Sequence, residues 1–126
     1  MGNYQELKVW QRSKNLAVYL YNTTKQKPFE QDYGLRDQIR RSVVSVPSNI
    51  AEGDELGTER QSVKFFYIAK GSLAEVMTQA IIAHEIGYLL KDNFSHIQSE
   101  CNEIGKMLNK LIQSRKESIE GNYSFA

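Results

Sequence analysis

The sequence contains few of the residues that interrupt helices or cross-link a chain. Its 126 residues include two prolines, Pro28 and Pro47, and one cysteine, Cys101. A single cysteine cannot form a disulfide within the chain, and a domain of this length can bury roughly two-thirds of its unfolded surface without one. Asn-Gly and Asp-Gly, the strongest signals of a tight β-hairpin, are absent. These absences favour a single all-α domain.

Signals for membranes, metals and catalysis are also missing. No apolar run approaches the ~20 residues of a membrane-spanning helix, and the N-terminus lacks the apolar stretch of a secretory signal, so we expect a cytoplasmic protein without membrane contact. The two histidines, His84 and His96, are not spaced as zinc ligands, and no glycine-rich phosphate loop occurs. Cys101 is expected to pack in the core. We therefore expect no metal, no cofactor and no enzymatic activity.

Apolar residues recur every three or four positions along four segments, as on the buried side of amphipathic helices. The predicted helices span about 5–24, 33–52, 59–90 and 94–116. Four such helices with short connections favour an antiparallel up-down four-helix bundle over residues 1–117. Residues 118–126 show no periodicity, and we expect them to form a flexible tail.

Details of the first two helices follow from the same spacing. The predicted inward stripe of the first helix consists of Leu7, Trp10, Lys14, Ala17 and Tyr21, and Val18 and Leu20 widen it. Lys14 is expected to lay its stem along the stripe with its charge in water. In the second helix the stripe continues through Pro47, which predicts a kink there instead of an end. Gly53 is expected to end this helix in a left-handed conformation.

The third helix carries more apolar residues than one buried face needs. Outside its central seam, one apolar flank consists of Phe66, Met77, Ile81 and Tyr88, and the other of Ile68, Ile82, Ile86 and Leu89. A bundle interior can cover one flank, so the other predicts a contact with a second copy of the chain. The alternative is that this helix is simply the most buried one. Gly71 and Gly87 are expected where another backbone passes close by.

Positive charge is concentrated near the N-terminus, although the net charge is only +1. Residues 1–41 hold eight Lys and Arg residues against four Asp and Glu residues, which gives 8 − 4 = +4. Such an excess can attract nucleic acid, although an ordinary solvated helix surface is the commoner explanation. The candidate phosphate-binding residues are Arg12, Lys14, Arg36 and Arg41. Arg40 is expected to pair internally, with Glu52 or Glu75.

Three stretches of the sequence resemble one protein family. They read LKVWQ at 7–11, QIRRSVVSVPSNIAEG at 38–53 and FYIAKGSLAE at 66–75. In this order they resemble the four-helix-bundle proteins encoded in intervening sequences of bacterial 23S ribosomal RNA genes, a family often labelled as ribosomal. The resemblance covers roughly residues 5–116. It suggests structural roles for the motif residues Arg40, Asn49, Glu52, Gly53, Gly71, Ser72 and Glu75.

The resemblance implies a left-handed bundle that assembles into a ring, typically a homopentamer. It also implies kinship with accessory proteins of diversity-generating retroelements, which bind a reverse transcriptase and nucleic acid through a basic surface. The family has no established enzymatic activity, and a net charge near zero argues against an ordinary ribosomal protein. Two hypotheses remain: an oligomeric accessory protein that binds RNA or DNA, and a protein-binding scaffold without a nucleic-acid role.

Overall fold

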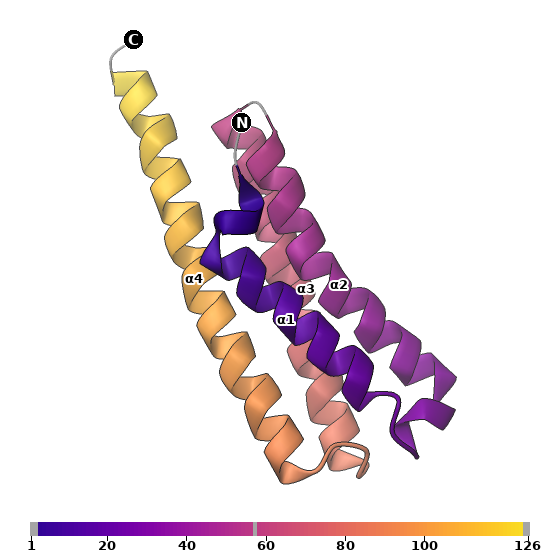
Figure 1. Ribbon diagram of the computed structural model, residues 1–126. Coiled ribbons are helices and arrows are strands. Elements are labelled where there is room, and N and C mark those ends of the chain that lie inside the picture. Colours follow the sequence, from indigo (N-terminus) through magenta and orange to yellow (C-terminus); the bar gives the residue numbers. More distant parts are fainter. Residues whose placement is uncertain (1–2, 57, 125–126) are drawn as a thin grey trace.

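The computed structural model describes residues 3–56 and 58–124, and within them the protein is helical throughout, without a strand. The elements are η1 (Tyr4–Glu6), α1 (Lys8–Thr23), η2 (Phe29–Gln31), α2 (Tyr33–Glu55), α3 (Glu59–Glu85) and α4 (Lys91–Ser124). Consecutive α-helices run in opposite directions (Figure 1). Both α1 and α3 pack against α2 and α4, so the helices surround one core. The predicted antiparallel up-down four-helix bundle is confirmed.

Aliphatic side chains at three- and four-residue spacing fill this core. The buried positions on α2 and α4 include Ile39, Val43, Val46, Ile50, Ile97, Cys101, Ile104 and Leu108. These eight residues recur every three or four positions along their helices, as the apolar periodicity of the sequence predicts. Fully burying an aliphatic side chain is worth roughly 1.5–3 kcal/mol, so these residues are a main source of the stability of the fold. None of the helices in the described part of the chain combines the length and the hydropathy needed to span a bilayer.

The buried side of α1 differs from the prediction. Its core residues are Val9, Ser13, Leu16, Ala17, Leu20 and Thr23. Leu20 is buried as predicted, whereas Tyr21 and Val18 are 39% and 54% exposed, so the predicted inward stripe is wrong at these two positions. The physical reason is that the observed face buries Leu16 beside Leu20, whereas the predicted face would bury the phenol ring of Tyr21.

α2 continues through Pro47 to Glu55, which confirms that the proline does not end the helix. The prediction for Gly53 is wrong, because this residue lies inside α2 and does not have a left-handed conformation. A Cβ atom at Gly53 would lie 2.8 Å from Phe66 Cε1 and 3.0 Å from the carbonyl oxygen of Ser62. The absence of a side chain at Gly53 is therefore what allows α3 to approach α2 so closely.

The ends of α3 and α4 also differ from the prediction. α3 ends at Glu85 instead of near residue 90, because Gly87 adopts a φ of 91° and the amide of Tyr88 then donates a hydrogen bond to the Ala83 carbonyl. α4 begins at Lys91 and continues to Ser124, so the segment predicted as a loose tail is helical up to that residue. Residues 125–126 lie outside the described part.

The predicted close approach of another backbone is absent at two glycines. A Cβ atom at Gly71 or at Gly87 would meet nothing within 4 Å. Gly87 is required for its positive φ instead, a conformation that glycine adopts more readily than any other residue.

Gly53→Ala is expected to lower the free energy of unfolding by about 1–3 kcal/mol, because the added methyl group overpacks the contact with Phe66 and the Ser62 carbonyl. Gly71→Ala is the matched control, since its methyl group enters open space and alanine favours a helix over glycine by up to about 1 kcal/mol. Urea unfolding of both variants and of the unaltered chain measures these changes. If Gly53→Ala is as stable as Gly71→Ala, α2 and α3 are not in close contact at this point.

Candidate functional site

The predicted phosphate-binding residues do not gather on one surface. Arg12 faces α4, where its Nε and Nη2 atoms donate hydrogen bonds of 3.0 and 3.1 Å to the two carboxylate oxygens of Glu100. This hydrogen-bonded ion pair lowers the pKa of the Glu100 carboxyl below its ordinary value of 4.5. Lys14 is exposed on α1 and forms no hydrogen bond or ion pair with any described residue. Arg12 is thus engaged within the chain, and Lys14 is accessible.

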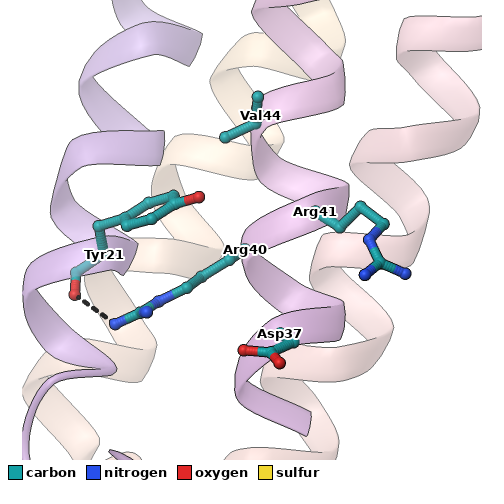
Figure 2. A pocket seen from close by; sticks show the side chains of 5 residues that line it. All are labelled: Tyr21, Asp37, Arg40, Arg41 and Val44. Carbon is teal, nitrogen blue, oxygen red and sulfur yellow. Dashed lines mark hydrogen bonds between the residues drawn. The ribbon is translucent and has the colours of Figure 1, made fainter. Parts of the chain in front are cut away.

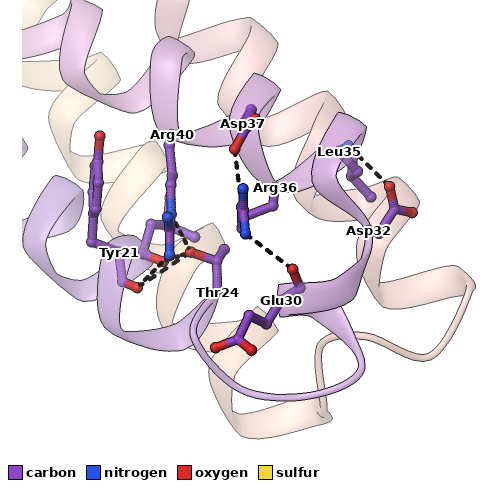
Figure 3. A network of polar contacts seen from close by, with 9 residues as sticks. Tyr21, Thr24, Glu30, Asp32, Leu35, Arg36, Asp37 and Arg40 are labelled. Atoms are coloured by element: carbon purple, nitrogen blue, oxygen red, sulfur yellow. Dashed lines mark hydrogen bonds and ion pairs between the residues drawn. The ribbon is translucent and has the colours of Figure 1, made fainter.

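Arg36 and Arg40 join α2 to the segments that precede it (Figure 3). Arg36 donates through Nε to Asp37 at 2.9 Å and through Nη1 to the carbonyl of Glu30 at 3.1 Å. Arg40 donates to the Thr24 hydroxyl at 2.8 Å and to the carbonyl of Tyr21 at 3.3 Å. The expectation that Arg40 is bound internally is confirmed, but its partners are a hydroxyl and a carbonyl.

Arg41 differs from the other arginines. Within residues 3–56 and 58–124 it forms no hydrogen bond or ion pair, and it is exposed. It borders an open hollow of about 400 Å³ between α1 and α2, whose other lining residues are Tyr21, Asp37, Arg40 and Val44. Figure 2 shows Arg40 extending towards Tyr21 while Arg41 extends to the opposite side of α2. The Arg40 guanidinium lies 4.8 Å from the centre of the Tyr21 ring.

A second, polar hollow of about 180 Å³ lies between α2 and α3. Its lining residues are Gln38, Arg41, Ser42, Ser45, Ser72 and Glu75. The Ser45 and Ser72 hydroxyl oxygens are 2.9 Å apart, and Asn49 Nδ2 donates to the carbonyl and hydroxyl oxygens of Ser45 at 2.7 and 2.9 Å. The family motifs therefore supply a hydrogen-bond network that holds α2 and α3 together. Glu52 and Glu75 are exposed, and neither pairs with Arg40.

The two apolar flanks predicted for α3 have different surroundings. In the first flank, Phe66 is fully buried, Met77 and Tyr88 are half-buried, and the Tyr88 hydroxyl donates to Asp32 at 3.0 Å. Leu89, of the second flank, is also buried. Phe66 and Leu89 are thus core residues and cannot form a surface contact, which corrects their assignment as interface candidates. Ile81 is 39% exposed.

The other three residues of the second flank remain open to solvent. Ile68, Ile82 and Ile86 are 42%, 46% and 54% exposed. Their spacing of fourteen and four positions puts them on one side of α3, and we call them the isoleucine stripe. The side is that of α2, because Ser72 and Glu75 of the same helix border the hollow shared with α2.

The described residues contain no group of three or more His, Cys, Asp or Glu side chains that could hold a metal ion. Burial raises the pKa of the Cys101 thiol to about 12, which keeps it protonated and unreactive near neutral pH. Its predicted place in the core is confirmed.

Sequence reasoning missed one buried ion pair. The Asp54 side chain is 4% exposed, and Arg115 of α4 donates to its Oδ1 atom at 2.9 Å. The partners are 61 positions apart, so no local spacing could have identified the pair. The sequence did contain one indication of this pair, which is Asp54 itself. It lies next to the buried face of its helix, and a buried carboxylate requires a cation as its partner.

The chain was compared with known proteins. A family model described as 23S rRNA-intervening sequence protein matches residues 5–110. A crystal structure of a protein of unknown function from the S23 ribosomal protein family of Bacteroides thetaiotaomicron is similar, with a TM-score of 0.77 and 21% sequence identity. The match covers 82% of this chain and 97% of that one, and at this identity it supports a shared fold alone. No curated protein matches the chain in sequence.

Arg12→Gln is expected to lower the melting temperature at pH 7, where the pair with Glu100 is ionised. Because the folded-state pKa of Glu100 is below its ordinary 4.5, the pair stabilises the fold above that pH. The difference between variant and unaltered chain should shrink as the pH falls through the lower, folded-state pKa. Lys14→Gln removes the same charge from a residue that has no partner in the described part of the chain, and it should change little at either pH. Equal effects of both variants would contradict a stabilising pair.

Proposed function

The chain belongs to the 23S rRNA-intervening sequence protein family, and we propose that it is a non-enzymatic bundle that assembles with further copies of itself through the isoleucine stripe of α3. The observation that carries this proposal is the exposure of Ile82 and Ile86, four positions apart and 46% and 54% exposed, together with Ile68 about four helical turns earlier on the same side of α3. Isolated exposed apolar residues are common on protein surfaces, whereas neighbouring ones, here Ile82 and Ile86, mark interaction surfaces.

The energy available from such a contact is considerable. Full burial of an aliphatic side chain is worth roughly 1.5–3 kcal/mol, and each residue of the isoleucine stripe is about half exposed. Self-association supplies a partner at all times, since every copy carries the same surfaces. The family resemblance further suggests that the assembly is a closed ring of five.

Ile86→Glu is expected to reduce the assembly to smaller species, because a charge would have to be buried against the neighbouring copy. Val18→Glu is the matched control, since Val18 lies on α1 and is also 54% exposed. Gel filtration with light scattering measures the mass of both variants and of the unaltered chain at tens of micromolar. A mass of 14.5 kDa for the unaltered chain would refute self-assembly.

Binding of single-stranded RNA or DNA is a second candidate function, and the observation that favours it is the exposed guanidinium of Arg41, which has no partner among the described residues. Arg41 lies between a polar hollow and a hollow that contains the stacked pair of Tyr21 and Arg40. Exposed aromatic rings and guanidinium planes stack on bases, and a free guanidinium binds phosphate. Repetition of this site on every copy of an assembly would strengthen a weak individual contact.

Arg41→Glu is expected to weaken binding of a fluorescent oligonucleotide at least about tenfold, measured by fluorescence anisotropy at about 50 mM salt. Lys91→Glu changes the net charge by the same amount at an exposed residue without a partner in the described part, and should have a small effect. Affinity for the unaltered chain should fall steeply towards about 200 mM salt. Absence of binding at low salt would leave self-assembly as the function.

A further inference from the structure

The first and last α-helices of the bundle, α1 and α4, differ strongly in length. α1 has 16 residues and α4 has 34. Because α1 starts at Lys8 beside residues 107–111 of α4, the C-terminal part of α4 continues without α1 beside it. The preceding element, η1, packs against α1 and α2. The side of the bundle formed by α1 and α4 is therefore left partly uncovered (Figure 1).

An apolar groove of about 420 Å³ lies at this position. Its lining residues are Leu7, Lys8, Val9, Met107, Lys110 and Leu111, and we call it the α1/α4 groove. Leu7, Met107 and Leu111 are half-buried and form an apolar floor. Lys8 and Lys110 are exposed, and neither ammonium group forms a hydrogen bond or ion pair with a residue in the ranges that the structure describes.

We infer that the α1/α4 groove of one copy binds the isoleucine stripe of the next copy, which rests on the self-assembly proposed above. The two surfaces are chemically complementary. Glu75 and Glu85 lie on the exposed side of α3 beside Ile82 and Ile86, and neither has an ion-pair partner among the described residues. The groove offers the opposite charges, from Lys8 and Lys110, around an apolar floor. A helix that presents apolar residues three or four positions apart is the usual occupant of such a groove, and Ile82 and Ile86 have this spacing.

The positions of the isoleucine stripe and the α1/α4 groove on the bundle support a contact between two different faces of neighbouring copies. The stripe lies on the side of the bundle formed by α2 and α3, and the groove lies on the side formed by α1 and α4. Both α1 and α3 pack against α2 and α4, so the four helices follow one another around the core. The α2/α3 side and the α1/α4 side are therefore opposite each other. Each copy can therefore donate one surface and accept with the other, which builds rings or chains.

A contact between two identical stripes is less favourable. A two-fold axis through the stripe would bring the carboxylates Glu75 and Glu85 of both copies close together, and like charges at an interface are repulsive. The groove would then remain open on both copies. The heterologous contact covers both apolar surfaces and pairs the carboxylates with lysines.

Cysteine cross-linking of coexpressed variants tests this inference. Ile82→Cys places a thiol on the stripe, and Lys110→Cys places one at the rim of the groove. Coexpressed and treated with a short bismaleimide, the two variants should give several-fold more cross-linked dimer than either alone. The unaltered chain controls for Cys101, which is buried.

The other outcomes separate the two proposals. If Ile82→Cys alone cross-links to itself, the stripe pairs with another stripe, and self-assembly stands while the groove inference is overturned. If the unaltered chain is an oligomer and neither variant nor their mixture cross-links, the groove inference is again overturned. If the unaltered chain has a mass of 14.5 kDa and no cross-link forms, both proposals are wrong.

Charge exchange provides a second measurement that leaves the apolar surfaces unchanged. The pair Glu75→Lys and Glu85→Lys, and the pair Lys8→Glu and Lys110→Glu, should each raise the concentration at which the assembly dissociates. Combining all four substitutions should restore assembly at least in part. A combined variant that assembles worse than both pairs would contradict a contact between these charges.

Discussion

The close contact between α2 and α3 is the constraint on which the arrangement of the other helices depends. Gly53 leaves room for the ring of Phe66, and the Ser62 hydroxyl donates a 2.6 Å hydrogen bond to the Gly53 carbonyl. The guanidinium of Arg115 lies 5.4 Å from the centre of the Phe66 ring while it binds Asp54, which attaches α4 to the same point. With α3 held this way, the isoleucine stripe turns away from the core, and an exposed apolar surface follows from the packing itself.

The sequence predicts the buried face of a helix correctly where the aliphatic residues lie on one side only. It fails where two sides of a helix are both candidates for burial. Asp32 and Thr58 accept hydrogen bonds from the amides of Leu35 and Gln61, as expected for helix N-caps. On α1 two stripes lie side by side, and the choice between them depends on contacts with other helices that no local pattern contains. Gly53 illustrates the same limit: its motif position is conspicuous in the sequence, but its purpose is evident only with Phe66 beside it.

The residues available to bind phosphate were harder to predict than the fold. They are the Lys and Arg side chains that have not formed an ion pair or hydrogen bond within the folded chain. An arginine is available to a ligand only if no carboxylate or carbonyl of the folded chain binds it first, and the partner of Arg12 is 88 positions away. Charge counts along the sequence therefore overestimated the basic surface. Arg41 and Lys14 remain available, while Arg12 and Arg36 contribute to holding the bundle together.

Apolar residues and charges would have separate roles in the assembly. An exposed ion pair contributes roughly 0–1 kcal/mol and is screened by salt, so the lysines of the groove cannot supply most of the binding free energy. Burial of the isoleucine stripe is largely insensitive to salt and is worth more, but it is not directional. Isoleucines alone would accept a partner helix in either direction. The unequal placement of carboxylates along α3 and of lysines around the groove is what can select one orientation, and a single orientation repeated at every contact is the condition for a closed ring.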